Sequence, residues 1–415
     1  MNRRRFLGQS SLGLLAAASG CSLPPVGAGA PERLFFTSAG RTCLIDSQGR
    51  GFRELEVSAP GQVTWQPTGF LEDGRALLLS MEARRDGPGR PFEEYYHQTP
   101  THVWAYDLER RTLEELATKD RMAPFYAPQL VLQEGRLLMQ VIRTRPGQTF
   151  NMRLDGSDAR EFTGPDEGLP YGHSLSPDGR RVAFHLASRE GYQIWTCDTR
   201  GGNRVKVAAK PGHLYFGPSW SPDGQWLAFQ DCLAPSDPGH DWSDVCVCHP
   251  DGSGFRSLTE DQAMWFAATY GSAAHRGGGS NVPTWTRDGR ILAALRLPGS
   301  RVPWEYQAHR PDTDHFNREF HPERARGGTA LARIHPGTGA IDWLTPHAEG
   351  VWDFRATESP GGHEVAFCRA ETGGVPHLRI VDARARESRK IHEGLGPGGL
   401  DHPRWLPRKV SSAKP

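Results

Sequence analysis

Residues 237–244 bring an imidazole and carboxylates together in one short loop. The segment reads Asp-Pro-Gly-His-Asp-Trp-Ser-Asp, so His240 and Asp241 are neighbours in a stretch bent by proline and glycine. An imidazole beside a carboxylate can transfer protons near neutral pH. We therefore predict catalytic roles for His240 and Asp241. The alternative is that these side chains only cap turns within the loop.

Residues 304–315 combine aromatic and charged side chains. Trp304 and Tyr306 are followed by His309 and His315, with acidic residues between them. Aromatic side chains offer flat apolar faces with a polar edge, and a few polar groups around such faces fix the orientation of a ligand. This composition suits stacking on sugar rings and bonding to their hydroxyls. We predict that Trp304 and Tyr306 contact a substrate and that His315 is catalytic.

Residues 274–281 form a glycine-rich segment, Ala-His-Arg-Gly-Gly-Gly-Ser-Asn. A phosphate-binding loop is excluded because the segment does not open a helix and lacks Gly-Lys-Ser/Thr. Its glycines let the backbone approach a ligand closely, and Arg276 is available for a carboxylate as a further catalytic candidate. The sequence contains no Gly-x-Ser-x-Gly elbow, so we assign no hydrolase triad.

Further polar residues stand where inner strands are expected to begin. We predict a catalytic role for Tyr215 and substrate contacts for His173, His213, Asp353 and His402. Each histidine has an alternative role as a structural residue held by hydrogen bonds. The prediction of a site therefore depends on the convergence of these residues on one face of the fold.

A repeated turn identifies the elements that would position them. Residues 176–184 read Ser-Pro-Asp-Gly-Arg-Arg-Val-Ala-Phe, and residues 221–229 read Ser-Pro-Asp-Gly-Gln-Trp-Leu-Ala-Phe. Proline sets the first corner of a tight turn and Asp-Gly supplies the positive φ, so each copy predicts a hairpin. Four-stranded units are expected at 33–58, 63–118, 125–163, 171–208, 215–259, 281–345 and 351–392.

These units predict an all-β, seven-bladed β-propeller over residues 33–407. Residues 401–407 match the start of an inner strand with no unit after it, so we expect this C-terminal strand to pair into the first blade and close the ring. An open solenoid is the alternative, and it would need polar capping repeats at both ends.

All long insertions are expected on one face, around the mouth of the central channel. Residues 81–101, 232–243 and 298–328 join second to third strands, and residues 260–280 join two blades. Loops longer than about 12–15 residues are usually functional or disordered. We predict that these wall a cleft, because they carry aromatic residues: Phe92, Tyr95, Tyr96, Trp242, Trp265, Phe266, Tyr270, Trp304, Tyr306 and Phe316.

The Ser-Pro-Asp-Gly repeat resembles the TolB-like, WD-type propeller family over most of residues 60–407. That family includes non-catalytic periplasmic adaptors, peptidase domains and oligogalacturonate lyases, so function depends on the site. The distant lyase resemblance implies β-elimination on a uronate oligosaccharide, for which a cation and a base are needed. Lyases of this type hold manganese through a late Gln and His motif, whereas residues 345–375 here offer His347 and His363 without a glutamine.

Two functional hypotheses follow. The first is an enzyme or binder of oligosaccharides, with a divalent metal (manganese or calcium) held by His240, His309 and His315; hydrolysis by an acid pair stays open. The second is a non-catalytic TolB-like propeller that binds an envelope protein or a glycan. The chain has 415 residues and a formal net charge of +1, so no broad basic field is available for nucleic acid. We expect a monomer.

The N-terminus predicts export. Residues 1–21 contain Arg3-Arg4-Arg5-Phe6-Leu7 and then a short apolar run, which resembles a twin-arginine signal. The run is shorter than the roughly 20 residues that span a membrane. Residues 18–21 resemble a lipoprotein box, with Cys21 as the lipidated residue; simple cleavage or a retained anchor is the alternative. We predict a periplasmic or cell-surface protein, in contact with the membrane only through this anchor, with a linker at 22–32 and a disordered tail at 408–415.

Six further cysteines, Cys43, Cys197, Cys232, Cys246, Cys248 and Cys368, raise the question of disulfides. Export permits them. The one pairing we consider is Cys232 with Cys246 or Cys248, and buried free thiols are the alternative. Cys246 and Cys248 alone do not predict a zinc site, which needs four ligands.

Overall fold

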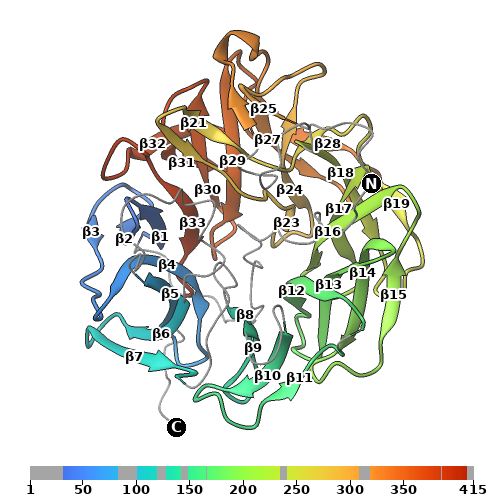
Figure 1. Ribbon diagram of the computed structural model, residues 1–415. Coiled ribbons are helices and arrows are strands. Elements are labelled where there is room, and N and C mark those ends of the chain that lie inside the picture. Colours follow the sequence, from blue (N-terminus) through green and yellow to red (C-terminus); the bar gives the residue numbers. More distant parts are fainter. Residues whose placement is uncertain are drawn as a thin grey trace.

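The computed structural model describes residues 31–82, 101–118, 128–141, 148–164, 166–233, 241–307, 318–384 and 386–408. Within these ranges the chain is built from β-strands, and the one helical element is a 3-10 turn at Pro322–Arg324. Figure 1 shows the sheets arranged as a wheel around a central axis. The prediction of an all-β propeller is confirmed.

The strands pair in antiparallel sets of four, in chain order from the inside of the wheel outward. The first three sets are β33 (Asp401–Trp405), β1 (Arg33–Ser38), β2 (Arg41–Asp46) and β3 (Arg53–Glu54); β4 (Gln62–Phe70), β5 (Ala76–Glu82), β6 (Thr101–Asp107) and β7 (Thr112–Leu116); and β8 (Pro128–Leu132), β9 (Arg136–Val141), β10 (Gln148–Arg153) and β11 (Arg160–Glu161).

The later sets share additional pairings that join them into one continuous sheet. They are β12 (Leu169–Leu175), β13 (Arg181–Ser188), β14 (Gly191–Asp198) and β15 (Val205–Ala208); β16 (His213–Trp220), β17 (Leu227–Leu233), β18 (Trp242–Cys248) and β19 (Arg256–Ser257); β23 (Thr284–Trp285), β24 (Ile291–Arg296), β27 (Thr329–Ile334) and β28 (Ile341–Trp343); and β29 (Val351–Glu358), β30 (Glu364–Glu371), β31 (His377–Asp382) and β32 (Ser388–His392).

The C-terminal strand pairs with the first one. Leu34 lies opposite Trp405 and Thr37 opposite Asp401 in the antiparallel register of β1 and β33. This places a strand from the end of the chain at the inner edge of the first set. The count of seven blades and the closure of the ring stay predictions.

The repeated turn has the predicted chemistry. The carboxylate of Asp178 accepts hydrogen bonds from the Ser176 hydroxyl at 2.6 Å and from the Arg180 amide at 3.1 Å. Gly179 has a φ of 70°, which a side chain would disfavour. The turn therefore fixes the register between β12 and β13, and with it the side chains that face the neighbouring blades.

A bulge interrupts the pairing of several inner strands at the same point. The register shifts after Tyr171 in β12, after Phe216 in β16 and after Phe354 in β29. The residue that follows is left-handed in each: Gly172 (φ 58°), Gly217 (φ 57°) and Arg355 (φ 56°), and His402 in β33 has a φ of 55°. A left-handed residue other than glycine costs about 1–2 kcal/mol. Two of the four positions therefore carry side chains in spite of this cost.

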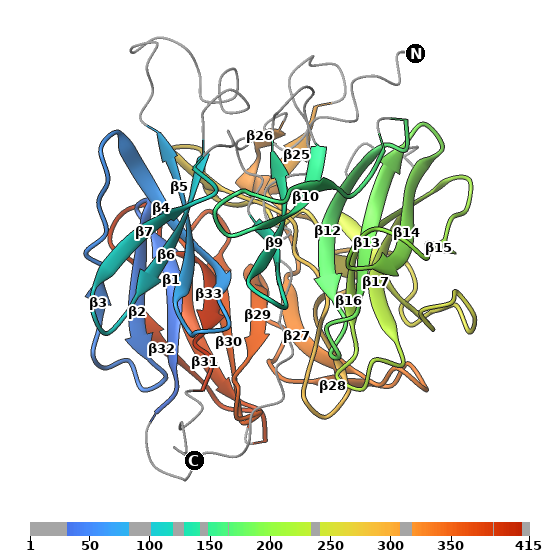
Figure 2. The same cartoon turned by 90° about the horizontal axis from the view of Figure 1, so that it is seen from below.

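The segments between the blades form small elements of their own. Residues 260–280 contain β20 (Met264–Trp265) and the hairpin of β21 (Tyr270–Ser272) and β22 (His275–Gly277). A second hairpin pairs β25 (Trp304–Tyr306) with β26 (Arg318–Phe320), and Figure 2 shows it at the upper rim of the wheel. None of the residues placed by the structure belongs to a helix long and apolar enough to cross a membrane.

All six described cysteines are buried free thiols, so the disulfide alternative is wrong. Cys246 lies opposite Phe229 across the β17–β18 ladder, three residues from Cys232 along β17. At about 3.4 Å per residue, and with odd and even residues on opposite faces, Cys232 cannot reach Cys246 or Cys248.

Candidate functional site

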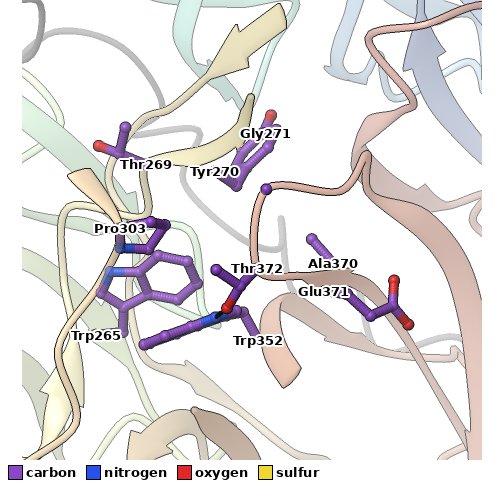
Figure 3. Close-up of a pocket in the computed structure, with 10 residues that line it drawn as sticks. Trp265, Thr269, Tyr270, Gly271, Pro303, Trp352, Ala370, Glu371 and Thr372 are labelled. Carbon is purple, nitrogen blue, oxygen red and sulfur yellow. Dashed lines mark hydrogen bonds between the residues drawn. The ribbon is translucent and has the colours of Figure 1, made fainter. Parts of the chain in front are cut away.

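An aromatic hollow opens between the β21–β22 hairpin and the inner strands β29 and β30 (Figure 3). Its volume is about 200 Å³. Sites for drug-sized ligands are usually roughly 300–1,000 Å³, so this hollow has room for one ring rather than a chain of them. The lining residues are Trp265, Thr269, Tyr270, Gly271, Pro303, Trp352, Ala370, Glu371, Thr372 and Gly373.

Two indoles form one wall of the hollow. The rings of Trp265 and Trp352 lie 5.2 Å apart at 54°. Trp352 Nε1 donates a hydrogen bond to the Thr372 hydroxyl at 3.0 Å, which fixes the orientation of its ring. Trp265 Nε1 is buried and has no acceptor among the described residues. Figure 3 shows the Glu371 carboxylate turned away from the indoles, so the polar groups nearest the rings are threonine hydroxyls.

The opposite wall, Tyr270, is held from behind by a charged network. Tyr270 Oη donates to Asp401 Oδ2 at 2.6 Å, and its ring stacks on Phe354 at 4.6 Å. Asp401 Oδ1 also accepts from Arg355 Nε at 3.1 Å and from the His402 amide at 2.7 Å. Tyr270 therefore links the hollow to the inner strands.

The network determines the charge of its members. Burial would raise the pKa of the Asp401 carboxyl, but Arg355, His402 and the hydrogen bonds together lower it to about 2. Burial and the Asp401 carboxylate raise the pKa of Tyr270 well above its usual value. At neutral pH the carboxylate is thus ionised and the phenol is a fixed hydrogen-bond donor.

We expect Tyr270→Phe to lower the free energy of unfolding by about 1.5–3 kcal/mol, the range for a hydrogen bond to a charged group. The ring and its stacking on Phe354 stay in place, so the loss reports on the bond to Asp401. Urea unfolding measures it. A variant as stable as the parent chain would show that this bond does not hold the wall.

The predicted residues Arg276, Trp304 and Asp241 hold the two hairpins together. The Arg276 guanidinium lies 5.2 Å from the centre of the Trp304 ring, and Trp304 is 4% exposed. Asp241 forms a buried ion pair with Arg318 at 2.6 Å, which ties β26 to the start of β18. These contacts are those of a support beside the hollow, and the catalytic roles of Asp241 and Arg276 and the substrate contact of Trp304 stay predictions.

His213 and Tyr215 lie together at the start of β16. His213 Nδ1 lies 2.9 and 2.8 Å from the two Asp231 carboxylate oxygens, and its ring stacks on Tyr215 at 5.8 Å. Burial raises the pKa of Tyr215, so its hydroxyl is neutral at physiological pH. His213 is an imidazole oriented by a carboxylate, whereas Tyr215 is 2% exposed.

The remaining predicted substrate contacts are mostly buried. His173 and Asp353 are 0% exposed, and the Asp353 carboxylate is occupied by Arg369 and Thr345. The His402 side chain is 18% exposed and lies beside Thr37, with 3.3 Å between its Nδ1 and the Thr37 hydroxyl. Burial lowers the pKa of His173 to about 3 and that of His402 to about 4, so both are neutral at pH 7.

Several predicted residues lie outside the described part of the chain: Cys21, His240, His309, His315 and the side chain of Tyr306. The predicted metal ligands are among them. In the ranges that the structure describes, no group of three His, Cys, Asp or Glu side chains is placed to hold a metal ion. These residues therefore give a metal no fitting site, and we route no chemistry through one.

Sequence reasoning placed Trp265 and Tyr270 in the expected cleft but did not identify Arg355 and Asp401. Arg355 follows Phe354 just as Gly172 follows Tyr171 and Gly217 follows Phe216. An arginine at a position where related strands have glycine is the signal that could have found it.

The comparisons with known proteins support the fold. No protein-family model matches the sequence, and no curated protein is similar to it by sequence. A puromycin-hydrolyzing peptidase of Mycobacterium tuberculosis superposes with a TM-score of 0.55 at 14% identity, over 93% of this chain and 56% of its own. An oligogalacturonate lyase in complex with manganese gives 0.53 at 13% identity, over 89% of both chains. TolB from Acinetobacter baumannii gives 0.47 at 15% identity, over 93% of this chain and 68% of its own. The chain thus has the β-propeller fold of TolB-like proteins.

Proposed function

We propose that the chain is an exported propeller that binds an oligosaccharide, with one sugar ring seated in the hollow beside Trp265 and Trp352. The observation that carries this proposal is the pair of indoles, oriented by Thr372 and facing Tyr270 across a space for one ring. Aromatic faces favour the apolar faces of sugar rings, and the hydroxyls of Thr269 and Thr372 can bond to a ligand at the edge.

Export and anchoring belong to the same proposal. The basic start and short apolar run of residues 1–21 support export, and Cys21 is the proposed lipid attachment site. A glycan is a ligand available outside the cytoplasm. Labelling with a radioactive fatty acid in the host tests the anchor: incorporation that Cys21→Ala abolishes supports it, and unchanged labelling contradicts it.

Ala370→Leu tests the hollow by filling it. Ala370 is 2% exposed and pairs with Trp352 across the β29–β30 ladder, so added methyl groups enter the space beside the indoles. We expect affinity for an oligosaccharide found with a glycan panel to fall at least about tenfold, a loss of about 1.4 kcal/mol. Isothermal titration measures it.

The matched control is Val381→Leu, which also enlarges a buried β-strand side chain, but in a core away from the hollow. Thermal unfolding must show that both variants fold. Equal affinity of Ala370→Leu and the parent chain would contradict the proposed seat, and loss in both variants would point to general overpacking.

Within this proposal, β-elimination on a uronate is the reaction to assay. Such a reaction needs a cation for the carboxylate and a base near the adjacent C–H. Arg276 at the Trp304 ring is a cation near the hairpins, and His240 and His315 are the proposed bases. Ultraviolet absorbance of an unsaturated product is the readout. A flat trace across an oligouronide panel would reject the lyase while leaving binding to be measured separately.

A further inference from the structure

A second polar cluster lies on the inner strands β29 and β33, which are neighbours in Figure 1. Its members sit at the bulges, where Arg355 and His402 take left-handed φ values that Gly172 and Gly217 take in β12 and β16. Glycine would satisfy this backbone without strain. The retained side chains therefore point to a role at the cluster, because strained positions collect at functional sites.

Arg355 is a buried cation with one nitrogen left over. Its side chain is 8% exposed; Nε bonds to Asp401, and one terminal nitrogen bonds to the Ser280 carbonyl. The other terminal nitrogen is buried and has no acceptor within the described chain. Guanidinium groups in proteins bind carboxylates through such donors.

Arg404 supplies a second cation on β33. It is partly enclosed, and no hydrogen bond or ion pair joins it to any residue in the described ranges. Burial alone lowers its pKa to about 10, with no carboxylate to offset that shift. His402 lies near both arginines: burial lowers its pKa to about 4, Asp401 opposes the shift, and Arg355 and Arg404 add to it.

The cluster carries one excess positive charge at neutral pH. Arg355 and Arg404 are cationic and Asp401 is anionic, while His402 is neutral. Burial keeps Tyr270 and Cys368, the other groups beside Arg355, in their neutral forms. An enclosed charge without a partner is unfavourable, so the cluster lacks one negative charge.

We propose that Arg355 and Arg404 bind the carboxylate of a small organic ligand at this place on the inner strands. A carboxylate carries the single charge that the cluster lacks, whereas phosphate carries about −1.5 to −2 near neutral pH. The proposal goes beyond oligosaccharide binding and does not depend on it, because the cluster is complete without the indoles of the hollow.

Thermal unfolding in graded acetate, at constant ionic strength with chloride, tests the site. A ligand that binds only the folded state raises the unfolding midpoint with its concentration, and we expect a saturable rise of about 2–5 °C for the parent chain. Arg404→Met should lose this response. It should also unfold at the same or a higher temperature in chloride alone, because it removes an unpaired charge.

Two variants separate the site from other effects. Arg404→Lys keeps the charge and should keep part of the acetate response, and Arg110→Met, at an arginine whose side chain is 82% exposed, should keep all of it. Ala370→Leu should also keep it, which distinguishes this site from the sugar seat. An equal response in Arg404→Met, no response in the parent chain, a response to phosphate but not acetate, or destabilisation of Arg404→Met in chloride would each overturn the proposal.

Discussion

Asp353→Ala is expected to lower the free energy of unfolding by about 3–5 kcal/mol, the cost of removing one partner of a buried ion pair. The Asp353 side chain is fully buried and accepts from Arg369 Nε at 2.6 Å and from a terminal Arg369 nitrogen at 2.8 Å. Thr345 Oγ1 adds a third bond at 2.6 Å.

The variant would leave two cations with no carboxylate between them. Burial lowers the pKa of Arg379, and the charge of Arg369 adds to that shift. Asp353 opposes it, so its removal exposes the repulsion. Chemical unfolding of the parent chain and the variant measures the loss.

Asp73→Ala is the matched control, because Asp73 pairs with Arg75 at 2.7 Å but its side chain is 53% exposed. An exposed pair contributes about 0–1 kcal/mol. Should Asp353→Ala cost no more than the control, the bracing role of this carboxylate would be wrong, and the sequence-based prediction of a substrate contact would gain support.

The second large effect is a loss of stability in mild acid. His173 and His185 are 0% exposed, and burial lowers the pKa of each to about 3 from 6.5. Below pH 6.5 the unfolded chain therefore binds protons that the folded chain does not. The stability is complete above about pH 6.5 and is lost as the pH falls toward 3.

At pH 5 the expected loss is about 2 kcal/mol for each histidine, or about 4 kcal/mol together, at 1.36 kcal/mol for each pKa unit. Urea unfolding at several values from pH 7 to pH 5 measures the slope. Aspartates with lowered pKa values add little in this range, because Asp401 stays ionised down to about pH 2.

His185→Phe should reduce that slope by about half. A phenyl ring fits the aromatic surroundings, where Tyr171, Tyr192 and Phe216 lie within 6 Å of the imidazole centre. The slope is the readout, so a general loss of stability does not affect it. His363→Gln, at an exposed histidine, should leave the slope unchanged; a parent chain equally stable at pH 7 and pH 5 would contradict the prediction.

The fold was predictable because its signal is local. Pro177, Asp178 and Gly179 set one turn and Pro222, Asp223 and Gly224 set another, and the strands follow at a fixed spacing. Trp265 and Tyr270 were predicted to wall a cleft for the same reason, as aromatic residues in a long insertion.

The roles of individual side chains were not predictable in this way. His173, Asp353 and Asp401 are all polar residues near the starts of inner strands, yet the first is buried as a neutral ring, the second bonds to Arg369, and the third bonds to Tyr270. These differences come from residues distant in sequence. Local spacing carries no information about them.

A crystal structure of the parent chain soaked with an oligosaccharide that it binds is the most direct test of the proposed seat. We expect density for one sugar ring against Trp265 and Trp352, bounded by Tyr270 and Ala370. A ring bound elsewhere on the propeller, with the hollow unchanged, would contradict the account.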